Sequence, residues 1–363
     1  MYPALAVVAE LKQQRDPLDI RWVGSVGGME QALVERADLT FESIAAVGLR
    51  GKNPIAALKS LWTLGQGYMQ SRRVIRDFQP DILFVTGGYV CVPVTLAARQ
   101  AGVPIIIYLP DIEPGLAIKF LARLADRVAV TTAEAQKFFR SGLTVVVTGY
   151  PVRRELTAPT WGETGAEVRA AARRKLGLGD DLPVLLVFGG SRGARSINRA
   201  VTGQLEAYLK VCQVVHVSGQ LDIEWVQARW AGLPPALQAR YHLSAYFHEE
   251  MVAALLAADL VVSRAGASTL GEYPAAGLPA ILVPYPYAGA HQNLNANYLA
   301  RHQAALVIKD TDLNLRLKDV VLNLITDKQQ LQTMRSASKS LAEPEAASRL
   351  AQEILEVGYR GGS

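Results

Sequence analysis

Cysteine is scarce in this chain of 363 residues, which contains only Cys91 and Cys212. The two lie far apart in apolar surroundings, so the sequence excludes a disulfide framework and predicts small core residues of a protein from a reducing compartment. The five histidines show no metal-ligand spacing, and no metal site is expected. No apolar run is long enough to cross a membrane, and the N-terminus lacks the basic and apolar regions of a secretory signal peptide.

A large excess of charge of either sign is also missing, since 38 Lys and Arg oppose 33 Asp and Glu. Basic residues are nevertheless concentrated in residues 50–76, with bulky apolar residues between them. They are Arg50, Lys52, Lys59, Arg72, Arg73 and Arg76, interleaved with Ile55, Leu58, Leu61, Trp62, Leu64, Tyr68 and Met69. This pattern predicts a basic amphipathic helix, which contacts either an anionic membrane surface or the protein's own core with a solvated basic side. Nucleic acid is not expected as a partner, because no basic run is interleaved with stacking aromatic residues on strands.

Short apolar runs alternate with helical periodicity along the whole chain. Strands are predicted at 20–24, 39–44, 81–86, 104–108, 127–130, 144–148, 184–188, 213–217, 241–245, 259–263, 280–284 and 304–308. Strands alternating with helices are typical of parallel sheets covered on both faces, so the expected class is α/β with two Rossmann-like domains. The strand-free stretch 151–182 marks the boundary. The predicted parts are 1–155, 156–342 and a C-terminal helix in 343–363 that crosses back to the first domain.

One strand–turn–helix in the second half carries chemistry. The strand 259–263 runs into a turn of small residues at Arg264, and Ser268 and Thr269 begin a helix that contains Glu272. Free backbone N–H groups and the partial positive charge of a helix start suit a phosphate, and a carboxylate one turn later can accept from two ribose hydroxyls. The segment is therefore either a nucleotide-diphosphate site or an ordinary turn with a serine N-cap.

Two further glycine turns follow strands. The strand 184–188 precedes the loop 189–194, which includes Gly190 and Ser191, and the strand 81–86 precedes Gly87 and Gly88. Glycine allows the backbone to approach a ligand closely, so each loop either holds a phosphate or is a plain tight turn. In open parallel sheets, ligands bind beyond the carboxyl ends of the strands, where all three loops are expected.

Taken together, the motifs of this chain resemble those of the MurG family of GT-B glycosyltransferases. The shared motifs are Tyr-Pro-Ala-Leu-Ala at 2–6, Pro-Asp at 80–81, Thr-Gly-Gly-Tyr at 86–89, Gly-Tyr-Pro-Val-Arg at 149–153, Gly-Gly-Ser-Arg-Gly-Ala at 189–194, Ser-Arg-Ala-Gly-Ala-Ser-Thr at 263–269, Gly-Leu-Pro at 277–279 and His-Gln-Asn at 291–293. The resemblance implies a GT-B fold, in which two Rossmann-like domains face each other across a cleft. It also implies transfer of N-acetylglucosamine (GlcNAc) from UDP-GlcNAc to the muramyl sugar of lipid I, with inversion, at the cytoplasmic face of the membrane.

The resemblance also implies roles for individual residues. The donor UDP-GlcNAc would be bound by Arg153, Gly190, Ser191, Phe247, His248, Arg264, Gly266, Ala267, Ser268, Thr269, Glu272, His291 and Gln292. Backbone near Phe247 and His248 would read the uracil edge. The pyrophosphate of the acceptor would face Gly87, Gly88 and Tyr89. No Asp-x-Asp motif adjoins a donor loop, so no cofactor is expected to be required, although a divalent cation could stimulate transfer.

The chain departs from the family at its start, after the strand 104–108, and at His291, which stands at the first position of a frequent Gln-Gln pair of the family. Members begin with a strand and a Gly-Gly-Thr-Gly-Gly-His loop before Tyr-Pro-Ala-Leu-Ala, whereas this chain starts at Met1. We therefore expect Met1 to be an internal methionine of a longer protein, and the missing central strand to leave two unpaired edges, a gap in the core, poor stability and low activity. Many members also have His-Glu-Gln-Asn after the strand 104–108, where this chain has Tyr-Leu-Pro-Asp at 108–111. Leu109 thus replaces the acidic side chain of the family. Asp111 and Glu113 are then the candidate general bases, or else surface residues of turns.

Three functions remain open from the sequence. The first is the GlcNAc transferase that forms lipid II. The second is a different GT-B enzyme, such as a glycolipid glycosyltransferase or a UDP-GlcNAc epimerase. The third is a UDP-sugar-binding protein without catalytic activity, which the missing histidine loop permits.

Overall fold

The structure of the protein, a computed structural model, describes residues 1–15, 17–28, 30–46, 54–157, 162–190, 193–286 and 291–361. The side chains of 54–59, 61, 162–164 and 360–361 lie outside this description. The chain divides into two compact units, the first formed by Met1–Pro151 with Glu345–Ser363 and the second by Val152–Pro344. Among the helices of the described residues, none is long and apolar enough to cross a membrane.

Parallel strands form two separate sheets in the first unit. The larger sheet has the order β3 (Leu83–Val85), β4 (Ile105–Leu109), β5 (Arg127–Val130) and β6 (Thr144–Val147), and the smaller one pairs β1 (Arg21–Ser25) with β2 (Thr40–Ile44). The apolar runs of β4 and β5 are buried throughout, as expected for parallel strands covered on both faces. In the part of the chain that the structure describes, β1 and β3 are each paired on one side only.

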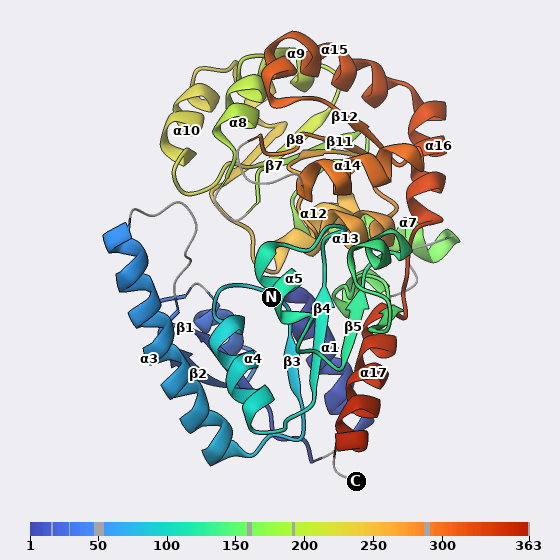
Figure 1. The fold of residues 1–363 in the computed structure, drawn as a ribbon. Helices are drawn as coiled ribbons and strands as arrows, with labels where there is room; N and C mark the ends of the chain where they lie inside the picture. The colour runs from blue at the N-terminus through green and yellow to red at the C-terminus, as the bar shows by residue number, and fades with distance from the viewer. Residues whose placement is uncertain are drawn as a thin grey trace. The chain divides into compact units, whose positions relative to one another are not determined.

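Helices cover both faces of the larger sheet (Figure 1). They are α1 (Tyr2–Gln14), α3 (Pro54–Phe78), α4 (Cys91–Gln100), α5 (Leu116–Leu121), the 3₁₀ helix η1 (Ala133–Phe138) and α17 (Ala346–Gly361), whereas α2 (Gln31–Glu35) packs with the smaller sheet. Side chains alternate along β4, so Ile106 packs in one core with α1 and α17 while Ile107 packs in the other with α3, α4 and α5. Arg127 on β5 forms ion pairs with Glu353 and Glu356, which hold α17 against the sheet.

The second unit contains one parallel sheet with the order β12–β11–β10–β7–β8–β9. Its strands are β7 (Val184–Phe188), β8 (Gln213–Val217), β9 (Tyr241–Ser244), β10 (Leu260–Ser263), β11 (Ala280–Leu282) and β12 (Ala305–Val307). This is the strand order of a Rossmann fold, in which the direction of chain progression reverses between β7 and β10. Every strand predicted from the sequence is thus present, with bounds that agree within two residues.

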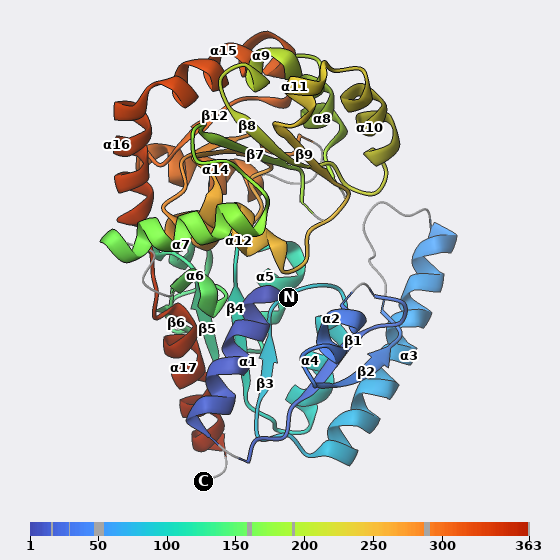
Figure 2. The same cartoon turned by 180° about the vertical axis from the view of Figure 1, so that it is seen from behind.

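Helices also cover both faces of this second sheet (Figure 2). They are α6 (Arg154–Thr157), α7 (Gly162–Lys175), α8 (Arg195–Thr202), α9 (Leu205–Leu209), α10 (Ile223–Ala231), α11 (Pro235–Gln238), α12 (Glu250–Ala257), α13 (Thr269–Ala276), α14 (His291–Arg301), the 3₁₀ helix η2 (Asp310–Asp312), α15 (Leu313–Thr326) and α16 (Lys328–Lys339). Helix α13 ends at Gly277, whose left-handed backbone (φ 58°) closes the helix because glycine tolerates that conformation. At the carboxyl ends of β7 and β10, loops connect each strand to the helix that follows it.

Candidate functional site

The predicted glycine loop and the Arg264 turn lie next to each other in the second unit. Strands β7 and β10 are paired, and their last residues, Phe188 and Ser263, are partners in the register. The loop that begins at Gly189 and the turn that begins at Arg264 therefore leave the sheet side by side, at the point where the strand order reverses. In open α/β sheets this point is where ligands bind.

The turn before α13 presents unused backbone donors. Among the described residues, the backbone N–H groups of Ala267 and Ser268 donate to no acceptor, whereas the N–H and hydroxyl of Thr269 both bind the carbonyl of Gly266. A Cβ added to Gly266 would meet no atom within 4 Å, so open space borders the turn. Free N–H groups at the start of a helix favour an anion, and this turn has the geometry for a phosphate.

Glu272 lies one turn into α13, in a cluster with three other predicted binding residues. Its carboxylate lies 3.5 Å from Nη2 of Arg153, and the Ser268 side chain hydrogen-bonds to it. Nη1 of Arg153 also donates to the carbonyl of His248 at 3.4 Å. Burial raises the pKa of the Glu272 carboxyl above its ordinary value, while Arg153 and Ser268 act in the opposite direction. A buried carboxylate beside anion-binding amides can accept hydrogen bonds from a diol.

In the segment after β9, the backbone N–H and carbonyl of His248 already have hydrogen-bond partners within the protein. The N–H of His248 donates to the Glu250 carboxylate at 3.2 Å, and its ring stacks edge-on to Tyr246 with centroids 4.6 Å apart. Phe247 is half-buried. The structure therefore places Arg153, His248, Ser268 and Glu272 in one cluster, while the predicted backbone contact to a base depends on groups of Phe247 rather than of His248.

Arg264 is held by residues that the sequence reasoning missed. Its Nη1 donates to Asp310 at 2.6 Å and to the Val283 carbonyl at 3.2 Å, and its Nη2 donates to the Ser196 hydroxyl at 2.8 Å. Ser196 in turn donates to Asp310 at 2.7 Å. Asp310 comes three residues after Val307, the end of β12. That position was the one sequence signal that could have found it, since parallel strands end at the same edge. The Arg264 charge is thus balanced within the protein.

The glycine loop after β7 requires its glycines. Gly190 and Gly193 have φ of 87° and 74°, a backbone region that other residues rarely adopt. A Cβ on Gly193 would lie 2.5 Å from the carbonyl oxygen of Ser218. Ser191, predicted to bind the donor, lies outside the described residues. The loop can therefore approach a ligand closely only with glycine at these positions.

A buried polar network fixes α8 behind this loop. His216 has no exposed surface; Nδ1 lies 2.6 Å from the Tyr241 hydroxyl and Nε2 lies 3.0 Å from Oδ1 of Asn198. Nδ2 of Asn198 donates to Asp222 and to the Ser218 carbonyl, so its Oδ1 accepts and His216 carries its proton on Nε2. Burial lowers the pKa of His216 to about 3, so the ring is neutral. The network joins α8 to β8 and β9.

The two predicted sugar-contact residues begin α14. Oε1 of Gln292 accepts from the N–H of Tyr285 at 2.8 Å, and Nδ1 of His291 is buried without a hydrogen-bond partner among the described residues. One turn further along the helix, Asn295 donates to the carbonyl of Ala265 at 3.1 Å. This bond connects α14 to the turn before α13.

In the first unit, the remaining predicted residues follow two neighbouring strands. Gly87 and Gly88 follow β3 with φ of 110° and 97°, and Tyr89 is 56% exposed. Asp111 and Glu113 follow β4, and Glu113 is paired with Lys119 at 3.0 Å. Since β3 and β4 are parallel neighbours, both loops lie at one edge of this sheet. Below the first loop, the thiol of Cys91 donates to the Gly87 carbonyl, and burial raises the pKa of that thiol to about 11.

The comparisons agree with this architecture. Residues 1–130 match the Glycosyltransferase family 28 N-terminal domain, and residues 184–350 match the Glycosyltransferase family 28 C-terminal domain. The crystal structure of Acinetobacter baumannii MurG superposes with a TM-score of 0.73 at 28% identity, covering 98% of this chain and 95% of that one. A UDP-GlcNAc 2-epimerase from Neisseria meningitidis has a TM-score of 0.68 at 13% identity, covering 98% of this chain and 96% of that one, which shows the fold alone.

The fold defines an α/β protein of the GT-B class. Two curated relatives carry the name UDP-N-acetylglucosamine–N-acetylmuramyl-(pentapeptide) pyrophosphoryl-undecaprenol N-acetylglucosamine transferase. The one from Roseiflexus sp. is 41% identical over 97% of this chain and 91% of its own, and the one from Bacillus subtilis is 35% identical over 98% and 96%. The chain belongs to the MurG family of glycosyltransferases.

Proposed function

We propose that this chain transfers GlcNAc from UDP-GlcNAc to the 4-hydroxyl of the muramyl sugar of lipid I, with inversion, and so forms lipid II in peptidoglycan synthesis. Relatives at 35–41% identity over nearly the whole chain support this assignment. The observation that carries it is the cluster of Arg153, Ser268 and Glu272 beside the unused N–H groups of the α13 turn. These groups match a ribose diol and a diphosphate.

The donor would lie over the reversal point of the second sheet. In this proposal the diphosphate lies on the N–H groups of Ala267 and Ser268, and Glu272 accepts from the ribose hydroxyls. The glycine loop with Gly190 and Ser191 and the guanidinium group of Arg264 complete the phosphate contacts. The segment of Phe247 and His248 faces the uracil, with the backbone contact made by Phe247. His291 and Gln292 take the sugar hydroxyls. Helix-start amides that stabilise the leaving UDP lower the barrier, because the charge develops on that group in the transition state.

The acceptor would use the loops of the first unit. We propose that Gly87, Gly88 and Tyr89 face the pyrophosphate of lipid I, and that Asp111 or Glu113 removes the proton of the attacking hydroxyl. Replacing each carboxylate separately by its amide distinguishes the two. The base variant, Asp111→Asn or Glu113→Gln, lowers kcat about 100-fold or more with little change in the KM for UDP-GlcNAc.

The first test is UDP release from UDP-GlcNAc, with and without a soluble lipid I analogue, for the wild type and Glu272→Ala. Release that depends on the acceptor and collapses in the variant is the expected result. Release without an acceptor, together with free N-acetylhexosamine, would instead indicate an epimerase. Saturable UDP-GlcNAc binding without turnover would indicate a binding protein.

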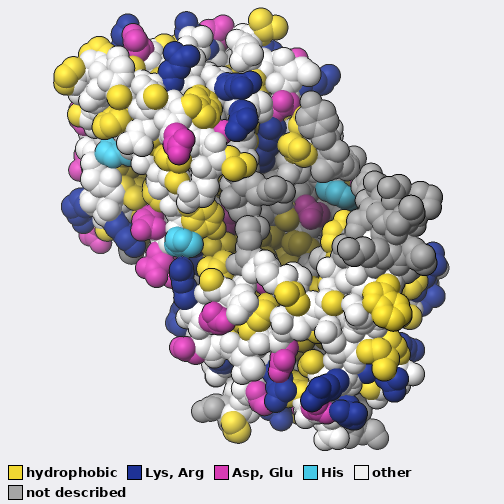
Figure 3. All heavy atoms as spheres, turned by 90° about the vertical axis from the view of Figure 1, so that its left-hand side faces the viewer, with side chains coloured by type: hydrophobic (Ala, Val, Ile, Leu, Met, Phe, Trp, Pro, Cys, Tyr) yellow, Lys and Arg dark blue, Asp and Glu magenta, His cyan; other side chains and the backbone are white. Residues whose placement is uncertain are grey.

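We also propose that the protein works as a peripheral protein at the cytoplasmic face of the membrane, through α3. Trp62 and Met69, seven residues apart, are 72% and 62% exposed, and the guanidinium groups of Arg73 and Arg76 are exposed on the same helix. Figure 3, which faces the side of the molecule that carries α3, shows hydrophobic and basic side chains close together on this unit. The side chains of three basic residues of the predicted segment, Arg50, Lys52 and Lys59, are not among those that the structure describes.

Vesicle flotation tests the membrane contact. Wild-type protein should float with vesicles containing anionic lipid and less with neutral ones, and salt should weaken the binding. Trp62→Gln with Met69→Gln should reduce binding to both, and Arg73→Gln with Arg76→Gln should remove only the preference for anionic lipid. Equal flotation of all variants would exclude α3 as the contact.

Transfer is further proposed to need no bound cofactor, with a divalent cation at most stimulating it. The support is the sequence, which has no Asp-x-Asp motif beside a donor loop. Activity that persists in EDTA and rises with Mg²⁺ is the expected result, and complete loss in EDTA would contradict the proposal.

A further inference from the structure

A separate cavity in the second unit carries more positive than negative charge. It has a volume of about 180 Å³ and lies where α7, α12, α13 and α16 meet. Its walls combine the small or apolar side chains of Ala166, Leu256 and Ala276 with the cationic side chains of Arg169, Arg335 and Lys339. Ala276 is at the opposite end of α13 from the Ser268 turn, so the cavity is distinct from the proposed donor site.

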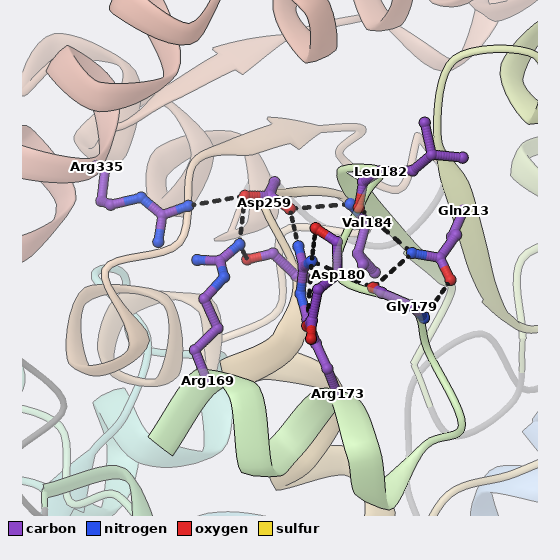
Figure 4. A network of polar contacts seen from close by, with 10 residues as sticks. Arg169, Arg173, Gly179, Asp180, Leu182, Val184, Gln213, Asp259 and Arg335 are labelled. Atoms are coloured by element: carbon purple, nitrogen blue, oxygen red, sulfur yellow. Dashed lines mark hydrogen bonds and ion pairs between the residues drawn. The ribbon is translucent and has the colours of Figure 1, made fainter. Parts of the chain in front are cut away.

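One carboxylate, that of Asp259, serves the cations at this cavity (Figure 4). Asp259 accepts from Arg169, from Nη2 of Arg173 at 2.9 Å and from the N–H of Val184 at 2.9 Å. These bonds tie α7 to the starts of β7 and β10. Nη2 of Arg335 lies 3.4 Å from the same carboxylate. The Asp259 oxygens therefore accept mainly from the other donors and only weakly from Arg335.

The charges around Asp259 do not balance. Arg169, Arg173 and Arg335 have side chains that are 21%, 10% and 18% exposed, and Asp259 is 19% exposed. Asp180, the other carboxylate near Arg173, is 4.0 Å away and 76% exposed, so solvent screens it. Among the described contacts, three partly buried guanidinium groups thus share one partly buried carboxylate.

The pKa values of two cations at the cavity are lowered. Burial, with Arg169 and Arg173 nearby, lowers the pKa of Arg335 to about 10, although Asp259 acts in the opposite direction. Burial and Arg335 also lower the pKa of Lys339. Among the described contacts, Arg335 has Asp259 as its one acceptor, and Arg169 uses only Nη2. Unused donors and uncompensated charge beside a cavity favour an anion, because its binding relieves both.

We propose that this cavity binds a small oxyanion of the phosphate class, held by Arg169, Arg335 and Lys339. The volume is sufficient, since each water molecule takes about 30 Å³ of liquid and a phosphate replaces only a few of them. Planar guanidinium groups match phosphate oxygens in pairs, and the ammonium group adds a point charge. The anion bridges α7 to α16 and so stabilises the second unit.

Equilibrium dialysis of the full chain against ³²P-phosphate tests this proposal, with saturating UDP present to fill the proposed donor site and constant ionic strength set by chloride. The wild type should bind one phosphate per chain. Arg335→Gln should weaken binding at least fivefold, and Arg335→Gln with Lys339→Gln should abolish it. Arg316→Gln, an exposed arginine on α15, is the matched control and should bind like the wild type. Glycerol phosphate in place of phosphate distinguishes a free anion from a phosphate ester.

Thermal unfolding in the same buffers separates an anion site from a structural ion pair. Phosphate should raise the Tm of the wild type and of Arg316→Gln but not of Arg335→Gln, while in chloride Arg335→Gln should melt at or above the wild-type temperature, because a surplus cation is gone. A wild type that binds no phosphate beside UDP, or an Arg335→Gln variant that binds it equally, would overturn the proposal. Failure of UDP itself to bind would count against the proposed function and leave the Arg335 comparison intact.

Discussion

Replacing Glu272 by Gln should weaken donor binding without weakening the fold. The carboxylate is 9% exposed, and Arg153 at 3.5 Å and the Ser268 side chain are the partners that hold it ready for a diol. Gln keeps the shape but accepts with one neutral oxygen. Loss of charge-assisted hydrogen bonds costs about 1.5–3 kcal/mol, which corresponds to a KM for UDP-GlcNAc about 10- to 150-fold higher.

The same substitution should act on stability with the opposite sign. Burial raises the folded-state pKa of Glu272, so the folded protein binds this proton more tightly than the unfolded chain does. That contribution to stability is fully present below the unfolded pKa, about 4.3, and is lost as pH rises through the higher folded pKa. Gln carries no charge at any pH. The variant should therefore gain stability relative to the wild type as pH rises from about 4 to 7.

Initial rates across donor concentrations and urea unfolding at pH 4.5 and 7.5 measure the two effects. Glu224→Gln, an exposed glutamate on α10, is the control and should change neither. A Glu272→Gln variant that keeps its KM but unfolds more easily at pH 7.5 would refute the reasoning. In that case Glu272 would serve as the ion-pair partner of Arg153, not as a ligand of the donor.

Two pairs of glycine substitutions test the backbone geometry, and one histidine substitution tests the buried network. Gly193→Ala places a methyl group 2.5 Å from the Ser218 carbonyl at a φ of 74°, and it should lower the Tm and raise the donor KM. Gly190 also has a positive φ, but a methyl group there meets no described atom within 4 Å. Gly190→Ala should therefore lower the free energy of unfolding by less, about 1 kcal/mol, in a urea titration. Gly67→Ala would put its methyl group 2.0 Å from the Ala45 carbonyl and should destabilise the first unit by more than about 2 kcal/mol. Its control on the same helix, Gly65→Ala, meets nothing within 4 Å and should be neutral or stabilise by up to about 1 kcal/mol; similar melts for both would exclude close packing there. The pKa of His216 is lowered to about 3, so the stability that the neutral ring contributes is present above about pH 6.5 and is lost as pH falls toward 3. His216→Gln should therefore be less stable than the wild type at pH 7.5, and the difference in the free energy of unfolding, measured by urea titration, should narrow at lower pH. A difference that does not depend on pH would contradict the neutral ring.

The strands and the turn that begins α13 could be predicted from the sequence because each rests on local information. A buried parallel strand is a continuous apolar run, as in Val184–Phe188, and a turn of Ala and Gly before Ser268 marks a helix start. Strand order is not local. The pairing of β7 with β10 brings together loops that are about seventy residues apart in the chain, and that pairing is what joins the two phosphate loops.

The partners of the charged residues could not be predicted for the same reason. Arg264 has the motif position of a phosphate ligand, yet Asp310 and Ser196 neutralise and orient it from two other segments. Likewise, the sequence treated Trp62 and Tyr68 as members of one apolar set on α3. They are six residues apart, which is about 240° around a helix, so Tyr68 packs against the core while Trp62 is exposed.

The division of the first unit into two sheets has a consequence for how the protein opens. The pair β1–β2 has no third strand among the described residues and rests on a small cluster formed by Val8, Val34 and Leu39 with a few partly buried neighbours. Two-stranded sheets are marginal by themselves, whereas β4 and β5 are paired on both sides and fully buried. The amide protons of β1 and β2 should therefore exchange with solvent through a local opening of low free energy, while those of β4 and β5 exchange only when the whole unit unfolds.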